Sequence, residues 1–324
     1  MMKLRHLLYA LLTLLIISCR TVNNPTVNPE PLKPSYRDVL AGLDWGTDTT
    51  FVYGHKTPDV DAVASALSYA SLMRALGYNC KAKVSTATNR ETAYIFNRLG
   101  FALPELKSSV AAGTHLILTD HSDYAQCVDG AKEAKILQKI DHHIEGDIAD
   151  ATIPYVRREM VGSTCTIIFG CFKDLGVPID DESARIMLAG IVSDTRNLTK
   201  TTTKGVDSTA WKALVSQLQL EDKIAEINRE MEEAAYNYDG MTDTEILLSD
   251  YKDYEIGKHL IGFGSLVCKE TEMDAFITRM LSVMPEVMKQ KGRDMIFAKI
   301  DNLIPNTDKS EYASPYISEL GCPI

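Results

Sequence analysis

From about residue 50 onward, short apolar runs alternate with longer amphipathic stretches. The runs "FVYG", "CKAKV", "HLILTD" and "ILQKIDHH" have the length and apolar content of strands. Apolar residues at helical spacing predict helices near 61–76 and 90–99, and a glycine follows each of them. Strands that alternate with helices are typical of a parallel sheet covered by helices. The fold class expected for this part of the chain is therefore α/β.

The pattern changes past about residue 236. Up to that point, helical spacing continues through "STCTIIFGCFKDLG", "SARIMLAGIVSDT" and 207–235. Beyond it come "YEIGKHLIGFGSLV", a predicted helix near 271–290, and "RDMIFAKI", in the order strand, helix, strand. The turn-forming segment "YNYDGMTDT" supplies a linker. We therefore expect a larger domain over 46–235 and a second, smaller α/β domain over 236–324 that is short at its C-terminus.

The N-terminus has the pattern of a secretory signal peptide. Lys3 and Arg5 precede an apolar run over 7–17, which is too short to span a bilayer. The ending "IISC" resembles a bacterial lipobox, in which the cysteine, here Cys19, carries lipid. A short membrane anchor or a buried helix is the alternative reading of the same run.

The segment after Cys19 is rich in proline, asparagine and threonine and shows no apolar periodicity, so it is predicted to be an extended tether. We therefore assign residues 1–18 to a lipoprotein signal peptide and 19–45 to the lipidated cysteine and tether, with the fold beginning between 36 and 45. The expected location is the cell envelope, where the lipid anchors the protein to a bacterial membrane outside the cytoplasm.

Composition adds two exclusions. The 324 residues are 45% hydrophobic and 24% charged, as in soluble globular proteins, and the net charge of −10 becomes −12 without Lys3 and Arg5. No basic tract offsets this charge, so no nucleic-acid partner is expected. The six cysteines other than Cys19 form no CxxC pair, which disfavours a zinc ribbon and leaves disulfide pairing open, although Cys165 and Cys171 are expected to be buried thiols.

Four segments end an apolar run with acids or histidines: "FVYGHKTPDVD", "HLILTDHSD", "ILQKIDHH" and "LAGIVSDT". In an open parallel sheet, ligands bind beyond the carboxyl ends of the strands, so these side chains are expected to converge there. Each motif alone has a structural explanation, for example Asp61 as a helix N-cap. The converging set is His55, Asp59, Asp61, Asp120, His142, His143 and Asp194.

Imidazole and carboxylate ligands suit Mn²⁺, Co²⁺, Zn²⁺ or Fe²⁺, and the set contains no thiol. Seven such groups exceed the needs of one ion, so two divalent metals sharing a carboxylate are expected. Without cations, so many acids in one cleft would repel one another and raise their pKa values.

With these motifs, "GHKTPDVDAVASALSYA", "LTDHSD", "IDHH" and "VSDT" followed by "TTT", the chain resembles the DHH phosphoesterases, and within them the manganese-dependent (family II) inorganic pyrophosphatases. The resemblance covers about residues 50–235. It implies a dimetal site in the larger domain, phosphate-binding basic residues in a DHHA2-like smaller domain, and pyrophosphate hydrolysis by a dimetal-bridged hydroxide. It also implies manganese as the metal, with cobalt as a substitute and magnesium as a candidate companion of the substrate.

The resemblance further implies roles for individual residues. His55 and Asp59 would bind one metal, Asp61, His142 and Asp194 the other, and Asp120 would bridge the two. His143 would face the substrate phosphate as donor or acid, and Asp141 would orient the neighbouring histidines.

The chain also departs from the family pattern. Thr57 and Ser122 stand where the family has asparagines, "YNYDGMTD" contains no lysine after the linker, and no Arg-Lys pair is visible near the end "YISELGCPI". Each charge-assisted contact to a phosphate contributes about 1.5 to 3 kcal/mol, so the missing basic residues would weaken the binding of pyrophosphate. The identity of the substrate is therefore left open. The cations expected to substitute are Arg196, Lys200 and Lys204, with Lys269 and Arg293 as further candidates.

Two alternatives to a pyrophosphatase stay open at this point. The same chemistry could act on short polyphosphate or nucleotide phosphoesters, or the chain could be a metal-binding lipoprotein without turnover. The only partners expected are a small phosphorylated substrate and a membrane. The oligomeric state is open, with a homodimer as one candidate.

Overall fold

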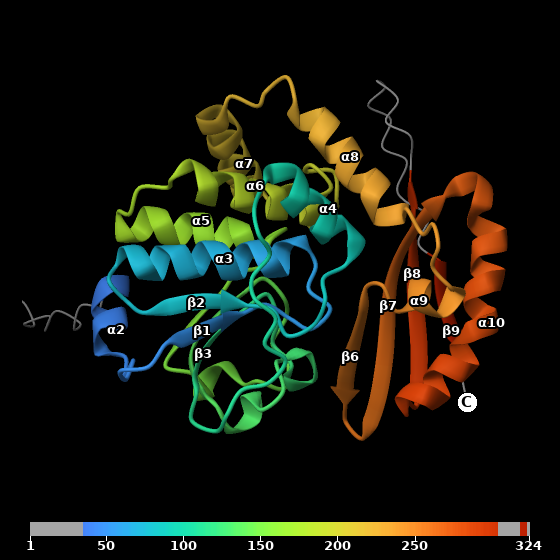
Figure 1. The fold of residues 1–324 in the computed structure, drawn as a ribbon, viewed down its shortest axis with the longest axis horizontal. Coiled ribbons are helices and arrows are strands. Elements are labelled where there is room, and N and C mark those ends of the chain that lie inside the picture. The colour runs from blue at the N-terminus through green and yellow to red at the C-terminus, as the bar shows by residue number, and fades with distance from the viewer. Residues whose placement is uncertain (1–34, 304–317, 323–324) are drawn as a thin grey trace, which may run out of the picture.

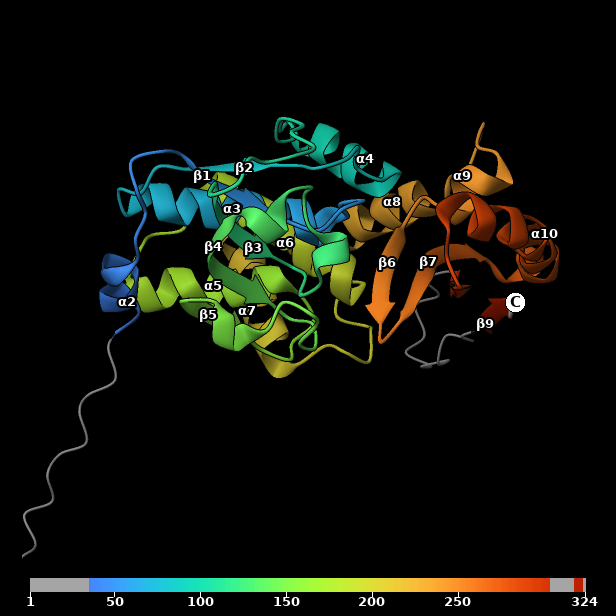
Figure 2. The same ribbon diagram turned by 90° about the horizontal axis from the view of Figure 1, so that it is seen from below.

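The computed structural model describes residues 35–303 and 318–322, which form two domains side by side (Figures 1 and 2). The larger domain contains a five-stranded sheet in the order β2-β1-β3-β4-β5, and every pair of neighbours is parallel. This arrangement confirms the α/β fold expected from the alternating pattern. The strands are β1 (Thr50–Tyr53), β2 (Cys80–Lys83), β3 (His115–Thr119), β4 (Lys135–Asp141) and β5 (Tyr155–Arg158).

Helices cover one face of this sheet, with α3 and α5 next to the strands and α6 and α7 over them (Figure 1). The strands alternate accordingly, so Val52, Ile117 and Ile140 join the helical core. Leu116 and Leu118 point to the other face and pack against short 3₁₀ turns and connecting segments. The helices are α2 (Tyr36–Gly42), α3 (Val60–Ala75), α4 (Arg90–Leu99), α5 (Thr164–Leu175), α6 (Asp181–Thr195), α7 (Gly205–Leu218) and α8 (Ile224–Tyr236).

The predicted helices near 61–76 and 90–99 are confirmed as α3 and α4, but two features differ from the sequence analysis. Helix α2, capped by Ser35, lies within the segment assigned to the tether, and its Leu40 is buried in the helical core. The folded domain therefore begins within the range 36–45 expected for its start, and only the assignment of the tether as far as residue 45 is wrong. Strand β5 was missed because "YVRR" is short and half polar, and pairing with β4 holds it extended.

The smaller domain is a four-stranded mixed sheet in the order β6-β7-β8-β9, preceded by α9 (Asp243–Leu247). The segment "YEIGKHLIGFGSLV" forms an antiparallel hairpin rather than one strand, and Gly257, at φ 64°, makes its turn. Helix α10 buries Phe276, Met280 and Met284 against one face of the sheet. The remaining elements are β6 (Tyr251–Ile256), β7 (His259–Lys269), α10 (Met273–Lys291), β8 (Met295–Leu303) and β9 (Ser318–Cys322).

Within the described residues, no helix is long and apolar enough to cross a bilayer. The five cysteines whose surroundings are described are buried and unpaired, which confirms the expectation for Cys165 and Cys171. The predicted signal peptide and Cys19 lie outside the described residues.

Strand β4 contains one fully buried cation. The Lys139 side chain is 0% exposed, and its Nζ lies 2.7 Å from Asp150 Oδ1 and donates to the carbonyl oxygen of Ile148 at 2.7 Å. It thereby fixes the segment that follows the histidines at the end of β4. Lys135, on the same strand, pairs with Asp44 at the surface instead.

We predict that Lys139→Ala lowers the free energy of unfolding by about 3 kcal/mol, because removing a fully buried side chain leaves a cavity and takes the donor from the carbonyl oxygen of Ile148. The matched variant Lys135→Ala should lower it by less than about 1 kcal/mol, because its ion pair is exposed. Urea unfolding followed by tryptophan fluorescence reports on this domain, since both tryptophans of the chain, Trp45 and Trp211, belong to it. Equal losses for the two variants would contradict the prediction.

Candidate metal centre

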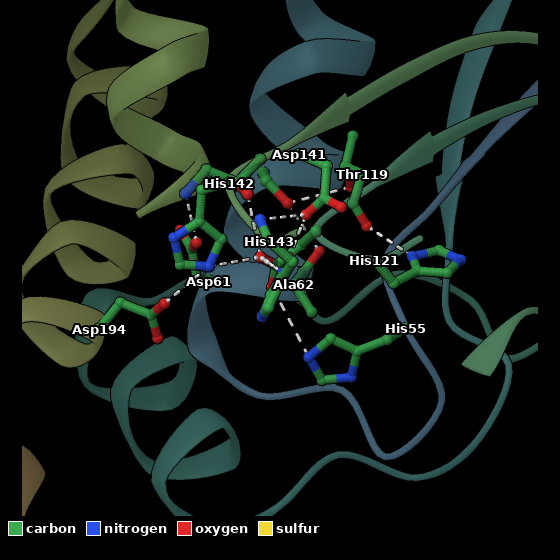
Figure 3. Close-up of polar contacts among 12 residues, drawn as sticks. His55, Asp61, Ala62, Thr119, His121, Asp141, His142, His143 and Asp194 are labelled. Atoms are coloured by element: carbon green, nitrogen blue, oxygen red, sulfur yellow. Dashed lines mark hydrogen bonds and ion pairs between the residues drawn. The ribbon is translucent and has the colours of Figure 1, made fainter. Parts of the chain in front are cut away.

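The acidic and histidine motifs meet at the carboxyl edge of the larger sheet (Figure 3). His55 follows β1, Asp120 follows β3, and His142 and His143 follow β4. Helix α3 supplies Asp59 and Asp61 at its N-terminal end, and α6 supplies Asp194 near its C-terminal end. All seven residues predicted from the motifs are therefore brought together.

Asp120 occupies the centre of this cluster and is 1% exposed. Its Oδ2 lies 3.6 Å from His55 Nε2, and its Oδ1 lies 3.3 Å from His142 Nε2. The two oxygens thus face two different sets of side chains. The backbone of Asp120 has a φ of 64°, a left-handed conformation that aspartate tolerates better than most residues.

The potential ligands fall into two main groups that share this centre. His55, Asp59 and Asp120 offer ligand atoms within 4.8 Å of one another, and so do Asp61, His142 and Asp194. A third combination joins Asp120 and His142 to His143. Nitrogen and carboxylate oxygen donors without a thiol fit Mn²⁺ and related divalent ions.

Both histidines of the two main groups are oriented by backbone carbonyls. His55 Nδ1 is 2.7 Å from the carbonyl oxygen of Lys56, and His142 Nδ1 is 3.0 Å from that of Val161. When each Nδ1 donates to its carbonyl, the lone pair of Nε2 faces the cluster, as in histidine ligands of metal sites. The donor set and its orientation therefore fit a pair of divalent cations.

Asp61 is held by the start of α5. Its carboxylate accepts hydrogen bonds from Ser163 Oγ at 2.7 Å, from the Thr164 amide at 2.7 Å and from the Cys165 amide at 3.1 Å. The reading of Asp61 as the N-cap of its helix is wrong, because Asp59 is the N-cap of α3 and accepts from the Ala62 amide at 2.9 Å.

The cluster carries more negative charge than its surroundings compensate. Burial, together with the charge of Asp120, raises the pKa of Asp61 to about 6, and burial with the charge of Asp61 raises the pKa of Asp194 to about 7. Burial lowers the pKa of His142, but its hydrogen bond to Asp120 outweighs this and raises that pKa to about 10. Protons and metal cations should therefore compete for these groups.

His143 differs from the other histidines because 42% of its side chain is exposed. Its Nδ1 is 2.9 Å from Oδ1 of Asp141, which is fully buried and also accepts from Ser122 Oγ. Although burial raises the pKa of Asp141, the hydrogen bonds from His143 and Ser122 hold that pKa well below its usual range. The structure thus places Asp141 where the sequence analysis expected an orienting carboxylate.

A cavity of about 640 Å³ opens from the cluster toward the smaller domain. Arg196, Lys200 and Lys204 line it, as the sequence analysis expected of phosphate-binding cations. The two further candidates are engaged elsewhere: Lys269 Nζ lies 5.4 Å from the centre of the Tyr236 ring, and Arg293 pairs with Asp253.

Sequence reasoning missed two cations of this cavity, Lys252 on β6 and Lys299 on β8. The Lys252 side chain is 18% exposed, and its Nζ lies 3.8 Å from Asp59 Oδ2. The segment "YNYDGMTD" contains no lysine, but the next strand, β6, brings Lys252 to the cluster. The inference that the smaller domain lacks a lysine at this position of the cavity is therefore wrong. "YKDY" gave no local signal for this role, because only the packing of β6 shows which of its faces meets the cavity.

Comparisons with known proteins agree with this geometry. Residues 49–191 match the model of the DHH family, N-terminal domain, and residues 229–305 match the model of the DHHA2 domain. A protein of Clostridium acetobutylicum described as "Probable manganese-dependent inorganic pyrophosphatase" is 30% identical over 263 residues, which cover 79% of this chain and 83% of that protein. A protein of an Exiguobacterium species with the same description is 29% identical over 276 residues, covering 82% and 86%.

Among solved structures, the crystal structure of a "putative family II inorganic pyrophosphatase" from Methanococcus jannaschii superposes with a TM-score of 0.70. It is 28% identical in sequence, and the match covers 78% of this chain and 84% of that one.

We predict that protein freed of metal with a chelator binds two Mn²⁺ ions per chain and that binding raises its melting temperature. Ions that bind the folded state at 100 times their Kd add about 2.7 kcal/mol of stability. Asp120→Asn should reduce the stoichiometry below two, because the shared carboxylate loses its charge. Isothermal titration calorimetry and elemental analysis measure this.

The control for this experiment is Asp129→Asn, which changes an exposed acid paired with Lys56. It should bind two ions as the unmodified chain does. Full binding by the Asp120 variant would show that the carboxylate does not join the two groups.

Proposed function

Because the chain belongs to the DHH family, we propose that it is a metal-dependent phosphohydrolase that cleaves inorganic pyrophosphate into two orthophosphates. The observation that carries this proposal is the position of Asp120, whose two carboxylate oxygens face two separate groups of ligands. His55, Asp59 and Asp120 would hold one Mn²⁺ ion, and Asp61, His142, Asp194 and Asp120 the other. Bound divalent cations lower the pKa of water and neutralise charge on phosphoryl oxygens.

The charges that line the cavity favour a role for metal in substrate binding. Among the described residues, five Arg or Lys side chains and His142, whose pKa is raised to about 10, face seven carboxyl groups, so the cavity without metal offers no excess of positive charge to a polyanion. Two divalent ions would supply that excess. The cations are Arg196, Lys200, Lys204, Lys252 and Lys299, and the carboxylates are those of Asp59, Glu91, Asp120, Asp194, Glu232, Asp250 and Asp301.

His143 is the residue positioned to supply a proton. Asp141 holds its Nδ1, so Nε2 of the exposed ring is the atom available to a substrate in the cavity. In the reaction, a water oxygen forms a new bond to one phosphorus while the bond from that phosphorus to the bridging oxygen breaks. A proton donated from Nε2 would stabilise the charge that develops on the departing phosphate.

The size of the cavity favours a second candidate substrate class. About 640 Å³ lies within the range of sites for drug-sized ligands, which is more than a pyrophosphate needs. Short polyphosphate or a nucleotide phosphoester would also fit the same metal and cation arrangement.

We predict that the chain loaded with Mn²⁺ releases phosphate from pyrophosphate and that Asp120→Asn lowers the rate by about 10³-fold, the effect of losing several kcal/mol of charge stabilisation. Asp129→Asn should retain the activity. The assay compares pyrophosphate with tripolyphosphate and nucleotide esters, and faster release from either of these would favour the second substrate class. Two bound metals with no release from any substrate would leave a metal-binding protein without turnover.

We also propose that the protein is a lipoprotein of the cell envelope, attached through Cys19 to the outer side of a bacterial membrane. The support is the sequence of residues 1–19, in which two basic residues and a short apolar run precede "SC". Two or more acyl chains on one cysteine give stable membrane attachment, whereas a single chain does not.

We predict that the full chain, expressed in a bacterium that processes lipoproteins, incorporates labelled palmitate and sediments with membranes. Cys19→Ser should abolish the labelling, because it removes the thiol that would carry lipid. Cys322→Ser is the matched control and should still be labelled. Labelling of the Cys19 variant would refute the attachment site.

A further inference from the structure

A carboxylate of the smaller domain, Asp301, lies on the side of the cavity that Arg196 and Lys299 line. On β8, Ile296, Ala298 and Ile300 alternate toward α10, so Lys299 and Asp301 belong to the alternate positions and line the cavity. The Asp301 side chain is 12% exposed. An acid at this position opposes the binding of an anionic substrate.

Asp301 binds two of the cations that a phosphate would need. Its Oδ2 lies 2.8 Å from Arg196 Nη2 and 3.2 Å from Lys299 Nζ. Oδ1 is buried and makes no hydrogen bond to any residue that the structure describes. One carboxylate oxygen therefore holds a guanidinium from the larger domain and an ammonium from the smaller one, as an oxygen of a phosphate would.

Arg196 lines the cavity and could contact a substrate there if Asp301 did not hold its guanidinium. It lies two residues after Asp194 and caps α6 in a left-handed conformation, with a φ of 45°. Its side chain is 22% exposed and that of Lys299 is 34% exposed, so both cations are accessible from the cavity. Only Asp301 is recorded as an ion-pair partner of these two cations among the described residues.

We propose that Asp301 is a specificity-determining residue that competes with the substrate for Arg196 and Lys299. A phosphoryl group that reaches these cations must displace the carboxylate, so Asp301 weakens the binding of compact phosphate anions. This inference rests on the proposed phosphohydrolase function, because it concerns the same cavity.

The test is Asp301→Asn in the full chain loaded with Mn²⁺. The amide keeps the shape of the side chain and removes its charge, so both cations become free for phosphate. The expected result is a KM for pyrophosphate about tenfold lower and a kcat changed by less than about threefold. Asp301→Glu, which keeps the charge, should retain a KM close to that of the unmodified chain.

A binding measurement separates this inference from the proposed function. Inorganic phosphate, titrated calorimetrically into the metal-loaded protein, should bind the Asp301→Asn variant about tenfold more tightly, whether or not pyrophosphate is hydrolysed. An unchanged or weaker affinity for phosphate would overturn the role of Asp301. Absence of hydrolysis by the unmodified chain would overturn only the proposed function.

The ion pair of Arg196 and Asp301 also joins the two domains. A control variant must therefore separate the loss of charge in the cavity from a change in how the two domains are held together. Arg90 donates from Nη1 to the carbonyl oxygen of Asn237 at 2.8 Å and from Nη2 to that of Asp239 at 2.9 Å, which fixes the linker outside the cavity. Arg90→Ala loosens this connection and leaves the charges of the cavity in place. It should not tighten phosphate binding, and tightening equal to that of Asp301→Asn would show that the effect comes from domain movement.

Discussion

Mutual repulsion among buried carboxylates is the constraint on which the rest of this structure depends. Asp61, Asp120 and Asp194 approach one another where burial penalises charge, and the raised pKa values of Asp61 and Asp194 express that cost. Backbone amides at the start of α5 and the two histidine rings offset part of it. Divalent cations offset the remainder, so metal binding and the stability of this edge of the sheet are linked.

The arrangement of the sheet makes this crowding possible without distorting the core. All five strands of the larger domain run parallel, so the segments that follow β1, β3 and β4 leave at one edge. Alternating apolar residues then pack above and below the sheet, and the charged groups stay outside both apolar clusters. Lys139 is an exception, and its ion pair with Asp150 fixes the segment after His142 and His143.

The larger domain and its ligands could be predicted from sequence because each motif directly follows an apolar run whose end fixes its position. His55, Asp120 and His142 needed no information beyond the order of strands. Lys252, Lys299 and Asp301 could not be found in this way, because their positions depend on how the smaller domain packs against the larger one. "YKDY" and "AKID" are typical of half-exposed strands, and only the tertiary structure shows which face meets the cavity. Strand β5 escaped prediction for a related reason, since pairing with β4 outweighs its weak local preference.

The left-handed backbone of Asp120 limits how this centre can evolve. Most residues lose about 1 to 2 kcal/mol in that conformation, while aspartate and asparagine hydrogen-bond locally and lose less. Glutamate would keep the charge, but its side chain is longer and its backbone would be strained in this conformation. Replacement of Asp120 by glutamate is therefore disfavoured, although the two acids often replace each other elsewhere. Asparagine or glycine would adopt this backbone conformation most easily but would remove the shared carboxylate, so a relative with either residue after β3 is expected to bind metal more weakly.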